Sequence, residues 1–181
     1  MSAHRIHFGF LRVPVARPPG LVFETLLTEA SVLALPLDHP LARRFKPSQP
    51  VPLEALRDTH LILVRRPGAP GLYANLLARL QQACIPVRVV AEVERMMANL
   101  NLVASGTGIS IVPASMRGTH AHSVVYRALA PDAGVEAPIT LARRETSDGA
   151  TCDRFLALVR RTAKQMSSEP AGNNRAKART R

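Results

Sequence analysis

A loop that combines adjacent arginines with glycine and proline carries the clearest candidate chemistry in this sequence. It contains Arg65 and Arg66, ends at Gly71, and stands between an apolar run at residues 61–64 and a segment with leucines at helical spacing. A loop at the carboxyl end of a buried parallel strand, leading into a helix N-terminus, presents backbone N–H groups that bind anions. The arginines add positive charge there. The pattern predicts an anion-binding loop, but arginines that merely project into solvent would give the same sequence.

Two other patterns resemble a catalytic pair and a cofactor-binding motif, but the residues around them do not support either interpretation. Asp38 beside His39 could be an acid–base pair, but no activated serine is present for it to serve, so we expect a turn. Gly106 and Gly108 resemble the start of a dinucleotide-binding fingerprint. That fingerprint follows a strand and opens a helix, whereas a helix precedes these glycines and a strand follows them.

The histidines and cysteines do not form a metal-binding pattern. His120 and His122 have no carboxylate or cysteine at ligand spacing, and we expect them on the surface. Cys84 and Cys152 are far apart in the sequence and belong to no C-x-x-C motif, which predicts two reduced, largely buried thiols. We therefore expect no metal, no cofactor and no enzymatic activity.

The stretch from Glu92 to Ser115 predicts a helix, a glycine turn and a short strand. Gly106 follows the last periodic residue and can adopt the left-handed conformation that ends helices. Residues 109–112 are too short and too β-branched for a second helix, and Pro113 closes the strand. The residues expected on the buried helix face are Val93, Met96, Met97, Leu100, Val103 and Ala104.

Strands and short helices alternate along the rest of the chain. This alternation predicts an α/β fold with a mainly parallel sheet that is covered on both faces. The expected strands are residues 6–11, 21–27, 31–35, 61–64, 87–91, 123–129 and 137–142, and the expected helices are 52–56, 72–83 and 150–165.

Length and charge limit the class of protein. The 181 residues suffice for one medium domain or two small lobes, and no apolar run is long enough to span a membrane, so a cytoplasmic location is expected. The net charge of +11 is spread over scattered arginine pairs and a polar C-terminal tail. No segment has the form of a helix-turn-helix. The charge therefore does not by itself indicate a nucleic-acid-binding protein.

Four motifs resemble the effector-binding domain of LysR-type transcriptional regulators. The longest is L-V-A-S-G-T-G-I-S-I-V-P-A-S at residues 102–115. The others are residues 9–12, 35–42 and 70–73, which occur in the family's order and approximate spacing. The resemblance covers roughly residues 5–163, and it implies a two-lobed α/β fold similar to type 2 periplasmic binding proteins.

The same resemblance implies how the chain is divided. Residues 1–27 would be a remnant of an incomplete first lobe, 28–115 the second lobe, 116–165 the return to the first lobe, and 166–181 a disordered basic tail. In the full-length family a helix-turn-helix precedes these lobes and binds DNA, and the regulator is a homo-oligomer. We expect this chain to lack that DNA-binding part and to begin within the first lobe.

The family binds a small-molecule effector between its lobes, and the matching positions imply candidate ligand contacts here. Arg12 could pair with an effector carboxylate or form an ion pair within its lobe. Tyr73 could stack on a ring or donate its hydroxyl. A solute-binding protein of a transport system, or a non-functional regulator fragment, stays open as an alternative. The candidate residues are Arg12, Val64, Arg65, Arg66, Gly71, Leu72, Tyr73 and Pro113.

Overall fold

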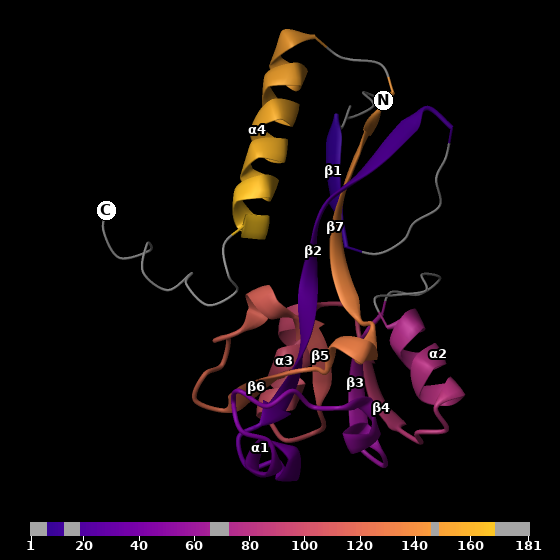
Figure 1. Cartoon of the computed structure of the whole chain (residues 1–181), viewed down its shortest axis with the longest axis vertical. Coiled ribbons are helices and arrows are strands. Elements are labelled where there is room, and N and C mark those ends of the chain that lie inside the picture. Colours follow the sequence, from indigo (N-terminus) through magenta and orange to yellow (C-terminus); the bar gives the residue numbers. More distant parts are fainter. Residues whose placement is uncertain (1–6, 13–18, 66–72, 146–148, 169–181) are drawn as a thin grey trace. The chain divides into compact units, whose positions relative to one another are not determined.

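The computed structural model describes residues 7–12, 19–65, 73–145 and 149–168. The chain forms two compact units (Figure 1). Unit 1 consists of Met1–Thr28 and Pro138–Arg181, and unit 2 of Glu29–Ala137. Two long strands, β2 (Leu21–Pro36) and β7 (Glu136–Arg144), contain residues of both units. The two units are described separately below.

The strands of unit 2 pair in two groups, β5–β2–β6 and β3–β4, and an isolated bridge joins the groups into a mixed sheet. They are the second half of β2 with β3 (His60–Val64), β4 (Arg88–Val93), β5 (Ser110–Pro113) and β6 (Val124–Ala128). β3 runs parallel to β4, and a bridge between Leu61 and Ile109 extends the parallel arrangement towards β5. β2 is antiparallel to both β5 and β6. The expected mainly parallel sheet is thus parallel only between β3 and β4 and at the bridge between Leu61 and Ile109.

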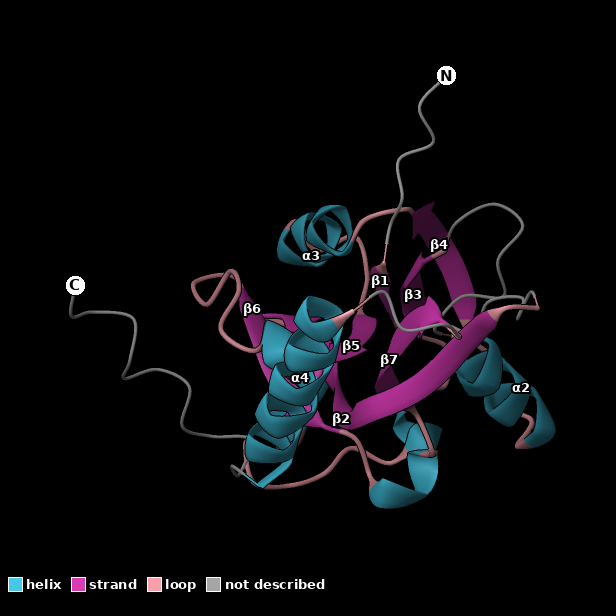
Figure 2. Ribbon diagram, turned by 90° about the horizontal axis from the view of Figure 1, so that it is seen from above, coloured by secondary structure: helices cyan, strands magenta, loops and turns pink. Residues whose placement is uncertain are grey.

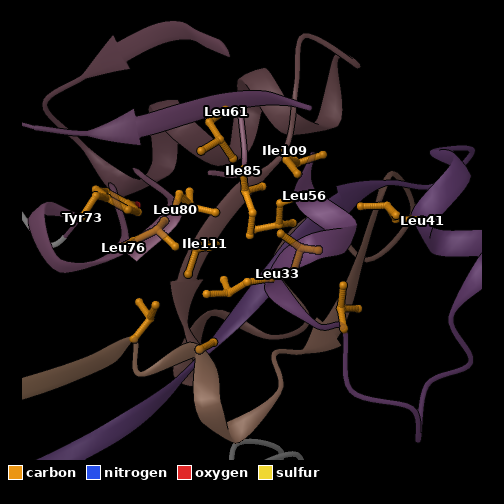
Figure 3. Close-up of a cluster of buried hydrophobic side chains, with 14 of the residues drawn as sticks. Leu33, Leu41, Leu56, Leu61, Tyr73, Leu76, Leu80, Ile85, Ile109 and Ile111 are labelled. Carbon is orange, nitrogen blue, oxygen red and sulfur yellow. The ribbon is translucent and has the colours of Figure 1, made fainter. Parts of the chain in front are cut away.

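Alternating side chains of this sheet enter two separate apolar clusters. Leu33 and Leu35 of β2 point into a cluster with α2 (Ala74–Gln82), which Figure 3 shows in close-up. Val32 and Ala34 point into a second cluster with α3 (Met96–Ala104). Strand side chains alternate between faces, so one strand can supply both clusters. The two helices cover opposite faces of the sheet (Figure 2).

Helix α3 ends as the sequence predicts, but its buried face differs. Gly106 has φ 80°, and its N–H donates to the Val103 carbonyl while the next N–H donates to Leu102. Met97, expected in the core, is 49% exposed, whereas Asn99 is fully buried. The prediction for Met97 was therefore wrong. The spacing of apolar residues could not show that the polar side chain of Asn99 is buried, where its amide donates a hydrogen bond to the Ile62 carbonyl.

The other short helices of unit 2 lie in connecting segments. α1 (Pro40–Arg44) begins where a simple turn was expected, because the His39 Nδ1 atom accepts the Leu41 N–H at 3.2 Å and caps it. Burial lowers the pKa of His39, although Asp38 raises it, and the cap requires the neutral ring. Single 3-10 turns occur at Leu53–Leu56, Ala114–Met116 and Pro131–Ala133.

Unit 1 combines antiparallel strands with the longest helix. β1 (Phe8–Leu11) pairs with β7, and α4 (Ala150–Ser168) packs through a ring contact of 4.7 Å between Phe8 and Phe155. The Arg160 guanidinium donates to both Glu24 oxygens, at 2.8 and 2.7 Å, and these hydrogen bonds lower the pKa of Glu24. None of the helices in the described residues is long and apolar enough to cross a membrane.

Three expected boundaries differ from the structure. Residues 21–27 and 31–35 belong to the single strand β2 rather than to two segments. Residues 116–137 pack in unit 2 rather than returning to unit 1, because β6 pairs with β2 along five positions. α4 continues through Ser168, past the expected start of the tail at residue 166. The rest of that tail, residues 169–181, lies outside the described residues.

Candidate ligand-binding site

The carboxyl ends of the parallel strands β3 and β4 bring charged and polar groups together in unit 2. Val64 is the last residue of β3 and is half-buried, and Arg65 follows it on the surface. The Arg65 N–H donates to the Val93 carbonyl at the end of β4, at 2.9 Å. Ligands of α/β proteins bind beyond the carboxyl ends of such strands.

The Arg65 guanidinium forms an ion pair across these two strands. Its Nη1 atom lies 3.4 Å from Glu92 Oε1, and the two side chains are 49% and 45% exposed. Arg65 is thus neither buried in the sheet nor extended alone into solvent. A half-exposed guanidinium can take a carboxylate in two-point geometry.

Tyr73 lies immediately before α2 and is only 2% exposed. Its ring packs among Leu76, Leu80 and other members of the first apolar cluster (Figure 3). The hydroxyl has no hydrogen-bond partner within the described part of the chain. Burial raises the Tyr73 pKa; the nearby Ser110 side chain and Val64 backbone oppose that rise, although neither meets hydrogen-bond geometry. Both the ring and the hydroxyl of Tyr73 are therefore buried in this structure.

Replacement of Tyr73 by phenylalanine is expected to leave the free energy of unfolding unchanged or to raise it by up to about 1 kcal/mol. A buried hydroxyl without a partner costs desolvation energy that phenylalanine does not incur. Urea unfolding of the two proteins measures the difference. A loss of more than about 1 kcal/mol would show that the hydroxyl has a strong partner in the folded protein.

A buried polar cluster next to Tyr73 was not found from the sequence. The Ile62 carbonyl accepts hydrogen bonds from Asn99 Nδ2 at 3.1 Å and from Ser110 Oγ at 2.8 Å. The pairing of β3 with β4 shifts register between Leu61 and Ile62. Asn99 stands three residues after Met96, at helical spacing, and this position was the available signal.

Pro113 is buried at the end of β5, where it pairs with Ser31 of β2. The next turn is fixed by Ser115, whose N–H and hydroxyl donate to the two carboxylate oxygens of Glu29 at 3.2 and 3.3 Å. The P-A-S motif therefore has a structural contact that its sequence alone did not reveal. Pro113 shapes the backbone there and offers no polar side chain.

The remaining candidate residues are not brought together by the described structure. Arg12 follows β1 and is half-buried, but it belongs to unit 1, whereas Val64, Arg65, Tyr73 and Pro113 belong to unit 2. Arg66, Gly71 and Leu72 lie outside the described residues. Within the described ranges, no group of three or more His, Cys, Asp or Glu side chains could hold a metal ion. The predicted burial of the cysteines was wrong for Cys84, which is exposed, while Cys152 is half-buried.

Comparison with protein families gives one match over most of the chain. The family described as "LysR substrate binding domain" matches residues 1–164. The transcriptional regulator CatR of Pseudomonas putida is 29% identical over 163 residues, which are 90% of this chain and 54% of CatR. TfdS of Cupriavidus pinatubonensis is 30% identical over 161 residues, 89% of this chain and 52% of TfdS. The chain thus spans about half the length of these curated relatives.

Solved structures agree with this result. CbnR, a LysR family transcriptional regulator, superimposes with a TM-score of 0.75 at 28% identity, over 87% of this chain and 53% of CbnR. The effector-binding domain of BenM with its effector benzoate gives a TM-score of 0.73 at 27% identity, over 91% of this chain and 73% of that domain. The fold is accordingly that of these effector-binding domains, the type 2 periplasmic-binding-protein-like fold.

Proposed function

The chain belongs to the LysR substrate-binding domain family, and we propose that it is the effector-sensing domain of a LysR-type transcriptional regulator that binds a small organic anion. The relatives support the regulatory role, since CatR and CbnR are transcriptional regulators. BenM binds benzoate, a small carboxylate, which supports the class of ligand.

The single observation that carries the choice of an anion is the position of Arg65. Its guanidinium is half-exposed beyond the carboxyl ends of β3 and β4, close in sequence and space to Val64, whose backbone approaches the Tyr73 hydroxyl. A half-exposed guanidinium is suited to binding a ligand carboxylate at two points. Arg12 of unit 1 is the second arginine that we propose for anion recognition.

Effector binding would act on the regulator by shifting a population. A ligand that binds one arrangement of a protein more tightly than another moves the equilibrium by that difference in affinity. We propose that another part of the regulator recognises DNA and that the full-length regulator is a homo-oligomer. The absence of enzymatic activity and the cytoplasmic location likewise belong to this proposal, which rests on the regulatory role of the matched relatives.

The proposal is tested by calorimetric titration of the chain with a panel of aromatic and aliphatic carboxylates that includes benzoate and shikimate. Arg65→Gln and Arg12→Gln are each expected to weaken binding by roughly tenfold or more, because a lost charged hydrogen bond costs about 1.5–3 kcal/mol. Arg57→Gln is the matched control, since Arg57 is an exposed arginine elsewhere in unit 2.

Two results would contradict the assignment. One is binding of only cations or neutral sugars from an extended panel. The other is carboxylate binding that Arg65→Gln and Arg12→Gln change no more than the control does. Both results would leave the fold and the family unaffected, and would remove only the anionic class of ligand.

A further inference from the structure

Two side chains of opposite charge meet beside the carboxyl ends of β3 and β4. Arg65 Nη1 and Glu92 Oε1 are 3.4 Å apart. From this contact, and resting on the effector-binding function argued above, we propose that Glu92 is an internal competitor for the ligand carboxylate at Arg65. Glu92 is then a positioning residue that sets the affinity of the site for anions.

The backbone holds the two residues next to each other. Glu92 pairs with Leu63 in the parallel ladder of β3 and β4, and the Arg65 N–H donates to the Val93 carbonyl at 2.9 Å. The contact therefore depends only on the rotamers of two side chains whose main chains are fixed. A carboxylate tethered in this way has a high effective concentration at the guanidinium, against which a free ligand must compete.

The contact is also weak enough to be displaced. A charge-assisted hydrogen bond is typically about 2.7–2.9 Å long, and exposed ion pairs contribute little to stability. The distance of 3.4 Å is longer than this, and both side chains are about half exposed. A ligand carboxylate that contacts the guanidinium at two points can replace Glu92, at the cost of the ion pair.

A neighbouring acidic residue provides a matched control. Glu94 lies two residues beyond Glu92, just after the end of β4, and is also exposed. The ion pair described for Arg65 is with Glu92. Glu92→Gln and Glu94→Gln each remove one negative charge from nearly the same place. Comparing them therefore separates the effect of the Arg65–Glu92 contact from that of the general electrostatic field.

The test is an NMR-monitored titration of the full chain with benzoate, and in a second arm with shikimate, at constant ionic strength. Glu92→Gln is expected to bind the carboxylate roughly two- to fivefold more tightly than wild type, the factor that a surface ion pair is worth. Glu94→Gln should stay close to wild type. In an Arg65→Gln background, Glu92→Gln should have no effect, which a merely structural role of Glu92 would not produce.

Each outcome decides the proposal. If Glu92→Gln and Glu94→Gln increase the affinity for the carboxylate equally, the effect comes from the general electrostatic field, and the proposed competition by Glu92 is wrong. Wild-type binding that Arg65→Gln weakens but Glu92→Gln leaves unchanged would overturn the competition while the anion-binding function stands. A third outcome is that neither benzoate nor shikimate binds to wild type or to Glu92→Gln. Arg65 would then not bind carboxylates even without its ion pair, and both the competition by Glu92 and the assigned anionic class of ligand would be wrong.

Discussion

Alanine at Gly108 is expected to destabilise unit 2 by about 3 kcal/mol, the cost of overpacking a tightly packed interior. A Cβ atom there would lie 2.6 Å from the His60 carbonyl oxygen and 3.3 Å from a side-chain carbon of Ile62. The carbonyl cannot move away easily, because it accepts the Ile109 N–H at 2.8 Å where β3 meets β5. The substitution therefore forces apart the strands that position Arg65.

Chemical unfolding of the intact chain, followed by circular dichroism, measures this effect. Gly9→Ala is the matched control, since a Cβ at Gly9 meets nothing within 4 Å and the residue also lies in a strand. The control should change the free energy of unfolding by less than about 1 kcal/mol. Equal stability of Gly108→Ala and wild type would show that β3 and β5 are farther apart than the structure places them.

A fragment of residues 29–137 is expected to fold cooperatively, whereas a fragment of residues 28–115, the lobe expected from the sequence, is expected not to. The longer fragment contains both apolar clusters of unit 2. The shorter one lacks β6, which pairs with β2 at five positions. Its loss leaves an unpaired strand edge and uncovers apolar side chains, which favours aggregation.

Loss of residues 116–137 also removes a polar contact that no apolar residue can replace. The Arg127 guanidinium donates to the Phe45 carbonyl at 2.8 Å and to the Ala42 carbonyl at 3.0 Å, and so satisfies the end of α1. Thermal unfolding and the dispersion of amide proton chemical shifts, measured for both fragments, show which of them folds cooperatively. Cooperative unfolding of the 28–115 fragment at the temperature of the 29–137 fragment would contradict the structural boundary.

Much of the secondary structure followed from local patterns in the sequence. The apolar run at residues 61–64 predicted a buried parallel strand, and β3 is parallel to β4 with Leu61, Ile62 and Leu63 buried. The glycine after the helical spacing predicted the helix end at Gly106, since few other residues adopt a positive φ. Such features depend on a few neighbouring residues, and the sequence contains those directly.

Some features of the candidate site could likewise be predicted from the sequence, and others could not. The sequence by itself determined that Arg65 follows a parallel strand, because a strand and the loop after it are adjacent in the chain. Only the tertiary structure decided that Arg65 meets Glu92, that Asn99 is buried against Ile62, and that the Tyr73 ring faces the core. Residue type and periodicity indicate which face of an element is apolar. The partner of a polar group is instead fixed by how separate elements pack, and here each partner comes from a different strand or helix.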